Sequence, residues 1–171
     1  MTLIYYLAAI VAVISTAMVI TRSNAVHALL YMVVSLLSLA LIFFTLGAPF
    51  VAALEVIIYA GAIVVLFVFV IMMLNLGAEA TARERQWLEP SAWRGPAVLS
   101  AVLFVEFLAL LVIEPGQAGA PAAVGVKRVG AALYGPYVLG VELAAMLLLA
   151  GLVGAFHLGR RVPSDGEEGE P

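Results

Sequence analysis

Long apolar runs alternate with short polar or Gly- and Pro-containing segments along this chain. Five of the runs are long enough to cross roughly 30 Å of hydrocarbon at about 1.5 Å per residue. The pattern predicts membrane-spanning helices at about 2–20, 26–46, 50–76, 96–113 and 137–158. Residues 1–158 are therefore expected to form the single membrane domain of an all-α integral membrane protein.

Residues that begin helices support these divisions. Asn24 is the predicted N-cap of the second span, and Pro49 and Pro96 fall at predicted first-turn positions of the third and fourth spans. The first two connections are very short, so the first three spans must be antiparallel neighbours. The longer segment 114–135, rich in Gly, Ala and Pro, has room to lie along the outer surface.

The distribution of basic residues predicts an orientation. The side with more basic residues should be cytoplasmic, which places the N-terminus outside and the C-terminus in the cytoplasm. Residues 159–171 are acidic and contain Gly, Ser and Pro, so we expect a disordered cytoplasmic tail. The richer side carries Arg22, Arg83, Arg85, Arg94, Arg160 and Arg161, and the other side carries Lys127 and Arg128.

Composition narrows the classes of function. The chain is 65% hydrophobic and 11% charged, whereas soluble domains carry about 25% charged residues. It has no cysteine, so no iron–sulfur or cysteine-based zinc site is expected. Nothing is basic enough for nucleic acid. We expect the lipid bilayer as a partner, no cofactor and no soluble small-molecule substrate on this chain.

Three carboxyl groups fall inside the predicted spans, namely Glu55, Glu106 and Glu142. A charge at mid-bilayer costs roughly 2.5 to 3.5 kcal/mol on insertion scales, so each needs an explanation. They are either protonatable groups on a proton path, or groups near enough to the outer interface to reach water or a partner's arginine. Tyr59 lies one helical turn below Glu55 on the same face and could extend a hydrogen-bonded line inward.

The third span is more distinctive than a generic apolar helix. Its sequence from Leu54 to Gly77 is LEVIIYAGAIVVLFVFVIMMLNLG. It resembles the third helix of the subunit J family (mitochondrial chain 6) of the proton-pumping NADH:quinone oxidoreductase, respiratory complex I. The chain length, five spans, short second loop and outside N-terminus also resemble the bacterial members.

The resemblance implies a non-redox membrane-arm subunit of a translocase in the bacterial inner membrane. Such a subunit helps couple electron transfer from NADH to quinone with proton translocation, beside other membrane-arm subunits. FMN and the iron–sulfur clusters of the assembled complex, and its use of NADH and quinone, would belong to other chains.

The resemblance also implies a π-bulge near Tyr59 and Gly61. A π-turn rotates the following helix face by about one residue, roughly 100°. Conversion between π and α would swing Val65 and Phe69 into or out of a water-filled seam, so the helix could gate proton movement without carrying the proton. In the alternative, this is an ordinary span in which Gly61 serves packing.

Two other functions compete with this one. The first is a small membrane subunit of a multisubunit cation/proton antiporter or of a membrane-bound hydrogenase, where related membrane segments occur. The second is a purely structural or assembly protein. That last role predicts that substitutions at Tyr59 and Gly61 matter only when they lower the amount of complex.

Overall fold

The part of the chain that the structure describes is mostly helical. The computed structural model describes residues 2–74, 90–113 and 123–160, and within these ranges it contains no strand. Five helical segments are long and apolar enough to cross a membrane, which confirms the predicted all-α class with five membrane helices. The elements are α1 (Thr2–Thr21), α2 (Ala25–Thr45), α3 (Pro49–Leu54), η1 (Glu55–Ile63), α4 (Val64–Leu74), α6 (Pro90–Ile113), α7 (Val126–Leu133) and α8 (Val138–Gly159).

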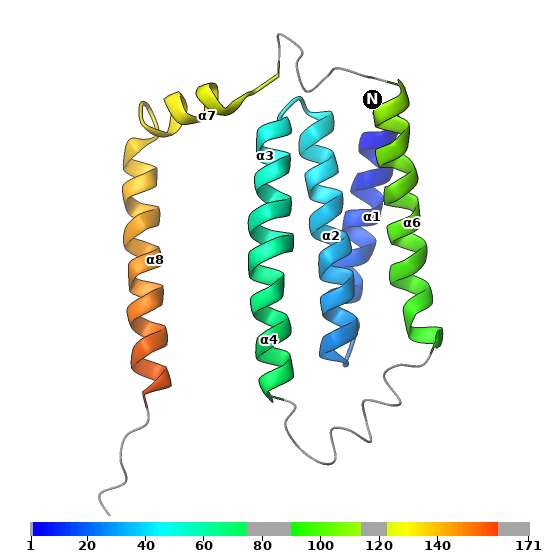
Figure 1. Cartoon of the computed structure of the whole chain (residues 1–171), viewed down its shortest axis with the longest axis horizontal. Coiled ribbons are helices and arrows are strands. Elements are labelled where there is room, and N and C mark those ends of the chain that lie inside the picture. Colours follow the sequence, from blue (N-terminus) through cyan, green and yellow to red (C-terminus); the bar gives the residue numbers. More distant parts are fainter. Residues whose placement is uncertain (1, 75–89, 114–122, 161–171) are drawn as a thin grey trace, which may run out of the picture. The chain divides into compact units, whose positions relative to one another are not determined.

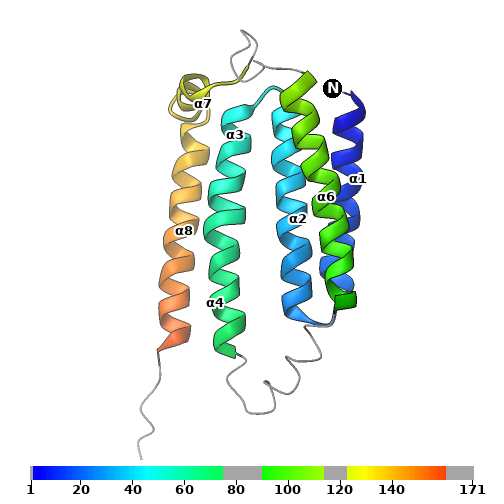
Figure 2. The ribbon, with the colours of Figure 1, turned by 45° about the vertical axis from the view of Figure 1, so that its right-hand side comes forward.

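The helices group into two compact units, Met1–Gly125 and Val126–Pro171. In the first unit, α1, α2, α6 and the third span, which is built from α3, η1 and α4, run alongside one another (Figures 1 and 2). The second unit contains α7 and α8. That residues 1–158 form one membrane domain stays a prediction, because each unit is defined by its own contacts.

Small side chains bring α1 and α2 together. Ala8, Ala12 and Ser15 lie on one face of α1 and are all buried, and small residues allow membrane helices to approach closely. The Thr16 and Ser35 hydroxyl oxygens are 2.8 Å apart and share a hydrogen bond between the two helices. This packing, and that of α2 against the third span, confirms the predicted neighbours.

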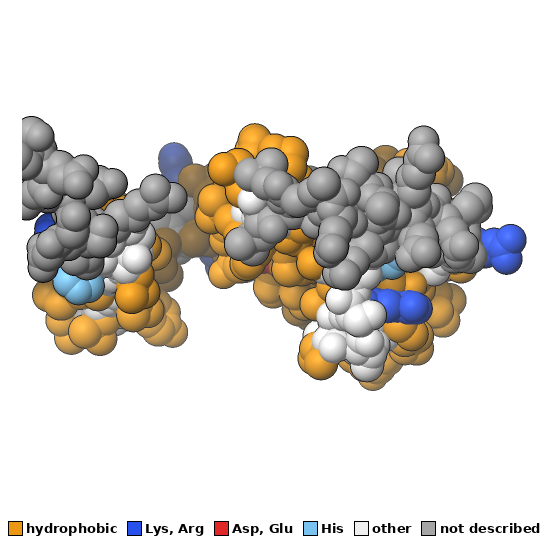
Figure 3. Space-filling model, turned by 90° about the horizontal axis from the view of Figure 1, so that it is seen from below, with side chains coloured by type: hydrophobic (Ala, Val, Ile, Leu, Met, Phe, Trp, Pro, Cys, Tyr) orange, Lys and Arg blue, Asp and Glu red, His pale blue; other side chains and the backbone are white. Residues whose placement is uncertain are grey.

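The apolar core of the first unit is formed by side chains of α1, α2 and α6. Outside this core, large hydrophobic side chains are widely exposed on the helices, and they make up most of the coloured surface in Figure 3. An apolar exterior of this kind fits lipid as the solvent. The core residues are Ala8, Val11, Val34, Leu41, Leu103 and Leu110.

The predicted starts of the second and third spans are confirmed. The Asn24 side-chain oxygen accepts hydrogen bonds from the backbone N–H groups of Val26, at 2.9 Å, and His27, at 3.3 Å. These bonds satisfy donors that have no partner within the helix. Pro49 lies in the first turn of α3, where its missing N–H costs nothing.

The turn from α2 to α3 requires a glycine. Gly47 has a φ of 78°, in the left-handed region that a residue with a Cβ rarely adopts. Its N–H donates to the Phe44 carbonyl at 3.0 Å, and the Ala48 N–H donates to the Phe43 carbonyl at 3.0 Å. This pair of bonds is a Schellman motif, which ends α2 and directs the chain into the third span.

The predicted first-turn position of Pro96 in the fourth span is wrong, although the apolar span itself, Trp93–Val112, begins within one turn of the predicted start. The helix begins at Pro90 and Pro96 lies inside it, although an interior proline removes a ladder bond and costs about 3 kcal/mol. Contact with α2 places this turn within the packed part of α6. A Cβ added at Gly95 would overlap the hydroxyl of Tyr31, a side chain that is 4% exposed.

Two boundary predictions fall partly outside the described residues. The third span is helical to Leu74, and residues 75 and 76 lie beyond that range. Gly159 is the last residue of α8, so it belongs to the helix and not to the predicted tail. The rest of that tail, from residue 161 on, lies outside the described residues.

Candidate functional site

A π-helix interrupts the third span between its two α-helical segments. The segment Glu55–Ile63 has π-helical geometry over nine residues, between the α-helical segments α3 and α4. The backbone N–H of Val64 donates to the carbonyl of Tyr59, five residues back. Since π-helices are rare and mostly occupy one turn, often at functional sites, this segment is the candidate functional site.

The four residues predicted for gating are divided between the π-helix and the helix that follows it. Tyr59 and Gly61 lie in η1, whereas Val65 and Phe69 lie in α4. The side chains of Tyr59, Val65 and Phe69 are about half exposed on this chain. Val64, at 5% exposure, is the buried residue of the described part of η1 and α4.

Gly61 has a close backbone neighbour that depends on the π geometry. A Cβ added at this position would lie 3.3 Å from the carbonyl oxygen of Val56, five residues back in the chain. That separation is tighter than most Cβ contacts, so a side chain here would press on the backbone of the π-turn. The absence of a Cβ at Gly61 therefore favours this conformation.

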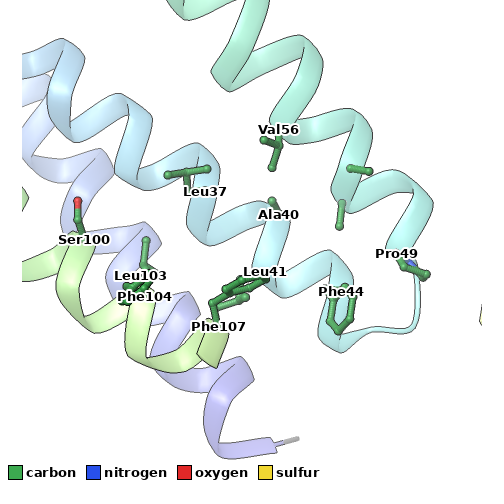
Figure 4. A pocket seen from close by; sticks show the side chains of 12 residues that line it. Leu37, Ala40, Leu41, Phe44, Pro49, Val56, Ser100, Leu103, Phe104 and Phe107 are labelled. Atoms are coloured by element: carbon green, nitrogen blue, oxygen red, sulfur yellow. The ribbon is translucent and has the colours of Figure 1, made fainter. Parts of the chain in front are cut away.

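An apolar cleft of about 460 Å³ lies beside the first turn of the π-helix. Figure 4 shows side chains from α2, from the third span and from α6 around it, with Val56 of η1 on one wall and Phe104 and Phe107 on another. Ser100 is the polar side chain among the twelve lining residues. A space with so few polar groups does not hold a chain of ordered water. The cleft nevertheless leaves one side of the π-helix loosely packed.

Glu55 opens the π-helix, and its side chain is partly buried. Its backbone N–H donates to the carbonyls of Val51 and Ala52, at the junction between α3 and η1. Within the described chain, no hydrogen bond joins its carboxyl group to the Tyr59 hydroxyl. The predicted hydrogen-bonded line between these two residues is therefore not formed in this conformation.

Glu106 lies in a different environment from the other two carboxyl groups. Its side chain is 5% exposed, and neither carboxyl oxygen has a hydrogen-bond partner among the described residues. It shares a face of α6 with the core residues Leu103 and Leu110, three and four residues away. In this conformation the chain covers most of the Glu106 side chain, and the interpretation that it reaches water or a partner's arginine stays a prediction. Glu142 is exposed on α8.

The spacing along α6 was a signal for this burial. Leu99, Leu103, Glu106 and Leu110 recur at intervals of three and four residues, which defines one helix face. The helices packed against that face, α1 and α2, contain no Asp, Glu, Lys or Arg. Among the described residues, no group of His, Cys, Asp or Glu is arranged to hold a metal ion.

These features define a class of protein: a polytopic helical membrane protein with a π-helical break in its third span. The chain belongs to the family described as NADH-ubiquinone/plastoquinone oxidoreductase chain 6, whose model matches residues 15–158. The resemblance seen in the third span is confirmed by this match, which covers four of the five predicted spans completely.

Curated relatives support the same assignment over nearly the whole length. NADH-quinone oxidoreductase subunit J of Pseudomonas aeruginosa is 59% identical over 158 residues, covering 92% of this chain and 95% of the relative. The subunit J of Escherichia coli K12 is 56% identical, covering 91% of this chain and 85% of the relative. That of Buchnera aphidicola from Schizaphis graminum is 49% identical, covering 94% and 98%.

Proposed function

We propose that this chain helps couple electron transfer from NADH to quinone with proton translocation, and that its third span is a gating element of the proton path. The observation that carries the proposal is the π-helix at Glu55–Ile63, in a chain of the chain 6 family. The relatives are named as subunits of an NADH-quinone oxidoreductase, so the competing antiporter and hydrogenase subunits have no observation in their favour.

The gate acts by rotating α4, the part of the third span that follows the π-helix. When a π-turn converts to an α-turn, the turn contains one residue fewer, and the following α-helix rotates by roughly 100° relative to the preceding one. Val64 is now the buried side chain, and its neighbour Val65 is exposed. Conversion to α would carry Val64 out of its contact and move Val65 and Phe69 to new directions. Bulky side chains would thereby open or close a seam against a neighbouring chain.

The apolar gating side chains, Val65 and Phe69, do not themselves carry the proton. The cleft beside η1 is apolar, and no hydrogen bond extends from Glu55 to Tyr59 in the described conformation. Glu55, Glu106 and Glu142 remain the candidates of this chain for a proton path, with Glu106 enclosed by α6 and its neighbours. Because the described part of the third span has no continuous chain of hydrogen-bonding groups in this conformation, the span is better suited to controlling the entry of water than to conducting protons.

The remaining parts of the proposal concern the setting of the chain. It lies in the bacterial inner membrane among other membrane-arm subunits, with its N-terminus outside. As a non-redox subunit of a proton-translocating oxidoreductase, it carries no cofactor. FMN, iron–sulfur clusters and the binding of NADH and quinone belong to partner chains.

The proposed orientation predicts the side on which reporters act. A reporter fused after Arg161 should be active in the cytoplasm, and one inserted near Gln117 should face outside, because six of the eight basic residues lie on the first side. Paired cytoplasmic and periplasmic reporters at each site provide the control. Cytoplasmic access to the insertion at Gln117 would contradict the orientation.

Glu55 is predicted to modulate coupling without being essential. Glu55→Gln keeps the size and hydrogen-bonding capacity while removing the charge, so the complex should assemble normally. Loss of an essential proton-transfer group costs about 10²- to 10⁴-fold in rate, whereas we expect less than about tenfold here. The measurement is inhibitor-sensitive NADH:quinone activity and proton uptake in membranes, normalised to assembled complex. Complete loss of pumping with normal assembly would make Glu55 essential.

A further inference from the structure

The short helix α7 separates its charged and apolar residues cleanly. At about 100° per residue, Val126, Val129 and Leu133 fall on one face of the helix, and Lys127 and Arg128 fall on the opposite face. Both basic side chains are exposed. Neither makes an ion pair or hydrogen bond within the described part of the chain. The helix thus presents two positive charges, without an acidic partner among the described residues, opposite an apolar stripe.

The turn after α7 sets its direction relative to α8. The Tyr137 N–H donates to the Ala132 carbonyl at 3.1 Å, and the Val138 N–H donates to the Gly135 carbonyl at 3.3 Å. Within this unit α7 lies across the end of α8 instead of continuing it (Figures 1 and 2). Because α8 is one of the helices able to cross the membrane, α7 then runs along the plane of the interface.

Two tyrosines lie in the turn between α7 and α8, at the depth expected for the lipid headgroups. Tyr134 directly follows α7 and Tyr137 directly precedes α8. Their side chains are 81% and 65% exposed. Tyrosine is enriched where a membrane meets water, because its ring suits the acyl region and its hydroxyl suits the headgroups. Charge pattern, direction and aromatic residues therefore agree on a headgroup location.

We propose that α7 is an interfacial anchor whose Lys127 and Arg128 bind the phosphates of anionic phospholipids. Its apolar face would rest on the acyl region beneath the headgroups, as in other amphipathic interfacial helices. Anionic lipid is the occupant that fits, since the two charges are adjacent and α7 itself has no acidic residue. The inference is independent of proton coupling, because it involves a different unit of the chain.

The test uses a photoactivatable amino acid at Val129, on the apolar face, in the assembled complex. The complex is reconstituted with equal amounts of phosphatidylglycerol and phosphatidylcholine, and the crosslinked products are identified by mass spectrometry. Lipid adducts are expected, enriched in phosphatidylglycerol by roughly fivefold per basic residue. The same probe at Ala131, on the charged face, should give fewer adducts through acyl chains.

Variants separate charge from structure. Lys127→Gln with Arg128→Gln should lower the phosphatidylglycerol enrichment to the bulk lipid ratio, with the amount of assembled complex unchanged. The charge-retaining exchange, Lys127→Arg with Arg128→Lys, should keep the enrichment. Adducts at Val129 to another subunit would show that a protein covers α7 and would overturn the proposal. Lipid adducts without headgroup preference in the parental complex would also overturn it.

Discussion

Gly61→Leu should lower NADH:quinone activity and proton pumping together, by about tenfold or more, while the complex still assembles. Leucine is a stronger former of α-helix than glycine by about 0.6–1 kcal/mol. Its Cβ would also lie 3.3 Å from the Val56 carbonyl in the π form, and its bulk would fill the space that a rotating face needs. Electron transfer from NADH to an artificial acceptor, which bypasses the membrane arm, should persist.

Three further variants make this result specific. Gly140→Leu makes the same chemical change in α8, where a Cβ meets nothing within 4 Å, and should leave pumping near the parental rate. Gly61→Ala should have an intermediate effect, since it adds the Cβ alone. Tyr59→Phe should be milder, because it keeps the ring and removes only the hydroxyl. If Gly61→Leu assembles and pumps at the parental rate, the third span is a scaffold and gating fails.

Gly95→Ala should destabilise the packing of α6 against α2 and reduce the amount of assembled complex. The added Cβ would overlap the Tyr31 hydroxyl, and it would lie 3.0 Å from the ring carbon that bears it. Tyr31 is buried and its ring also lies 5.6 Å from the guanidinium carbon of Arg22, so the ring has little room to move. Overpacking of this kind costs about 1–3 kcal/mol.

The same contact supplies its own control. Tyr31→Phe removes the hydroxyl that the new Cβ would meet, so the double variant Tyr31→Phe/Gly95→Ala should recover part of the lost stability. Recovery should be incomplete, because the ring carbon remains close. Thermal inactivation of the purified complex gives the four values of the double-mutant cycle. If Gly95→Ala costs the same stability with and without the Tyr31→Phe change, this contact is not the cause.

Much of the fold follows from local sequence because the bilayer imposes strong local constraints. A helix that crosses hydrocarbon satisfies its backbone hydrogen bonds internally, so hydropathy and length predict the spans. Asn24 and Pro49 mark helix starts through groups that act on their own backbone. Pro96 was wrongly predicted to lie in the first turn of its helix. Packing keeps the residues before this proline helical, so the helix begins earlier.

The candidate site was also predictable from the sequence only in part. The sequence alone determined the apolar spans and the resemblance of the third one, which identified Tyr59 and Gly61. Its π geometry over nine residues was decided by the backbone in three dimensions, because the hydrogen bonds of α- and π-helices differ in spacing by only one residue and the same sequence can form either. The burial of Glu106 was also a tertiary outcome. A carboxyl near the end of an apolar helix is exposed or enclosed according to which helices pack on that face, and α1 and α2 are distant from it in sequence.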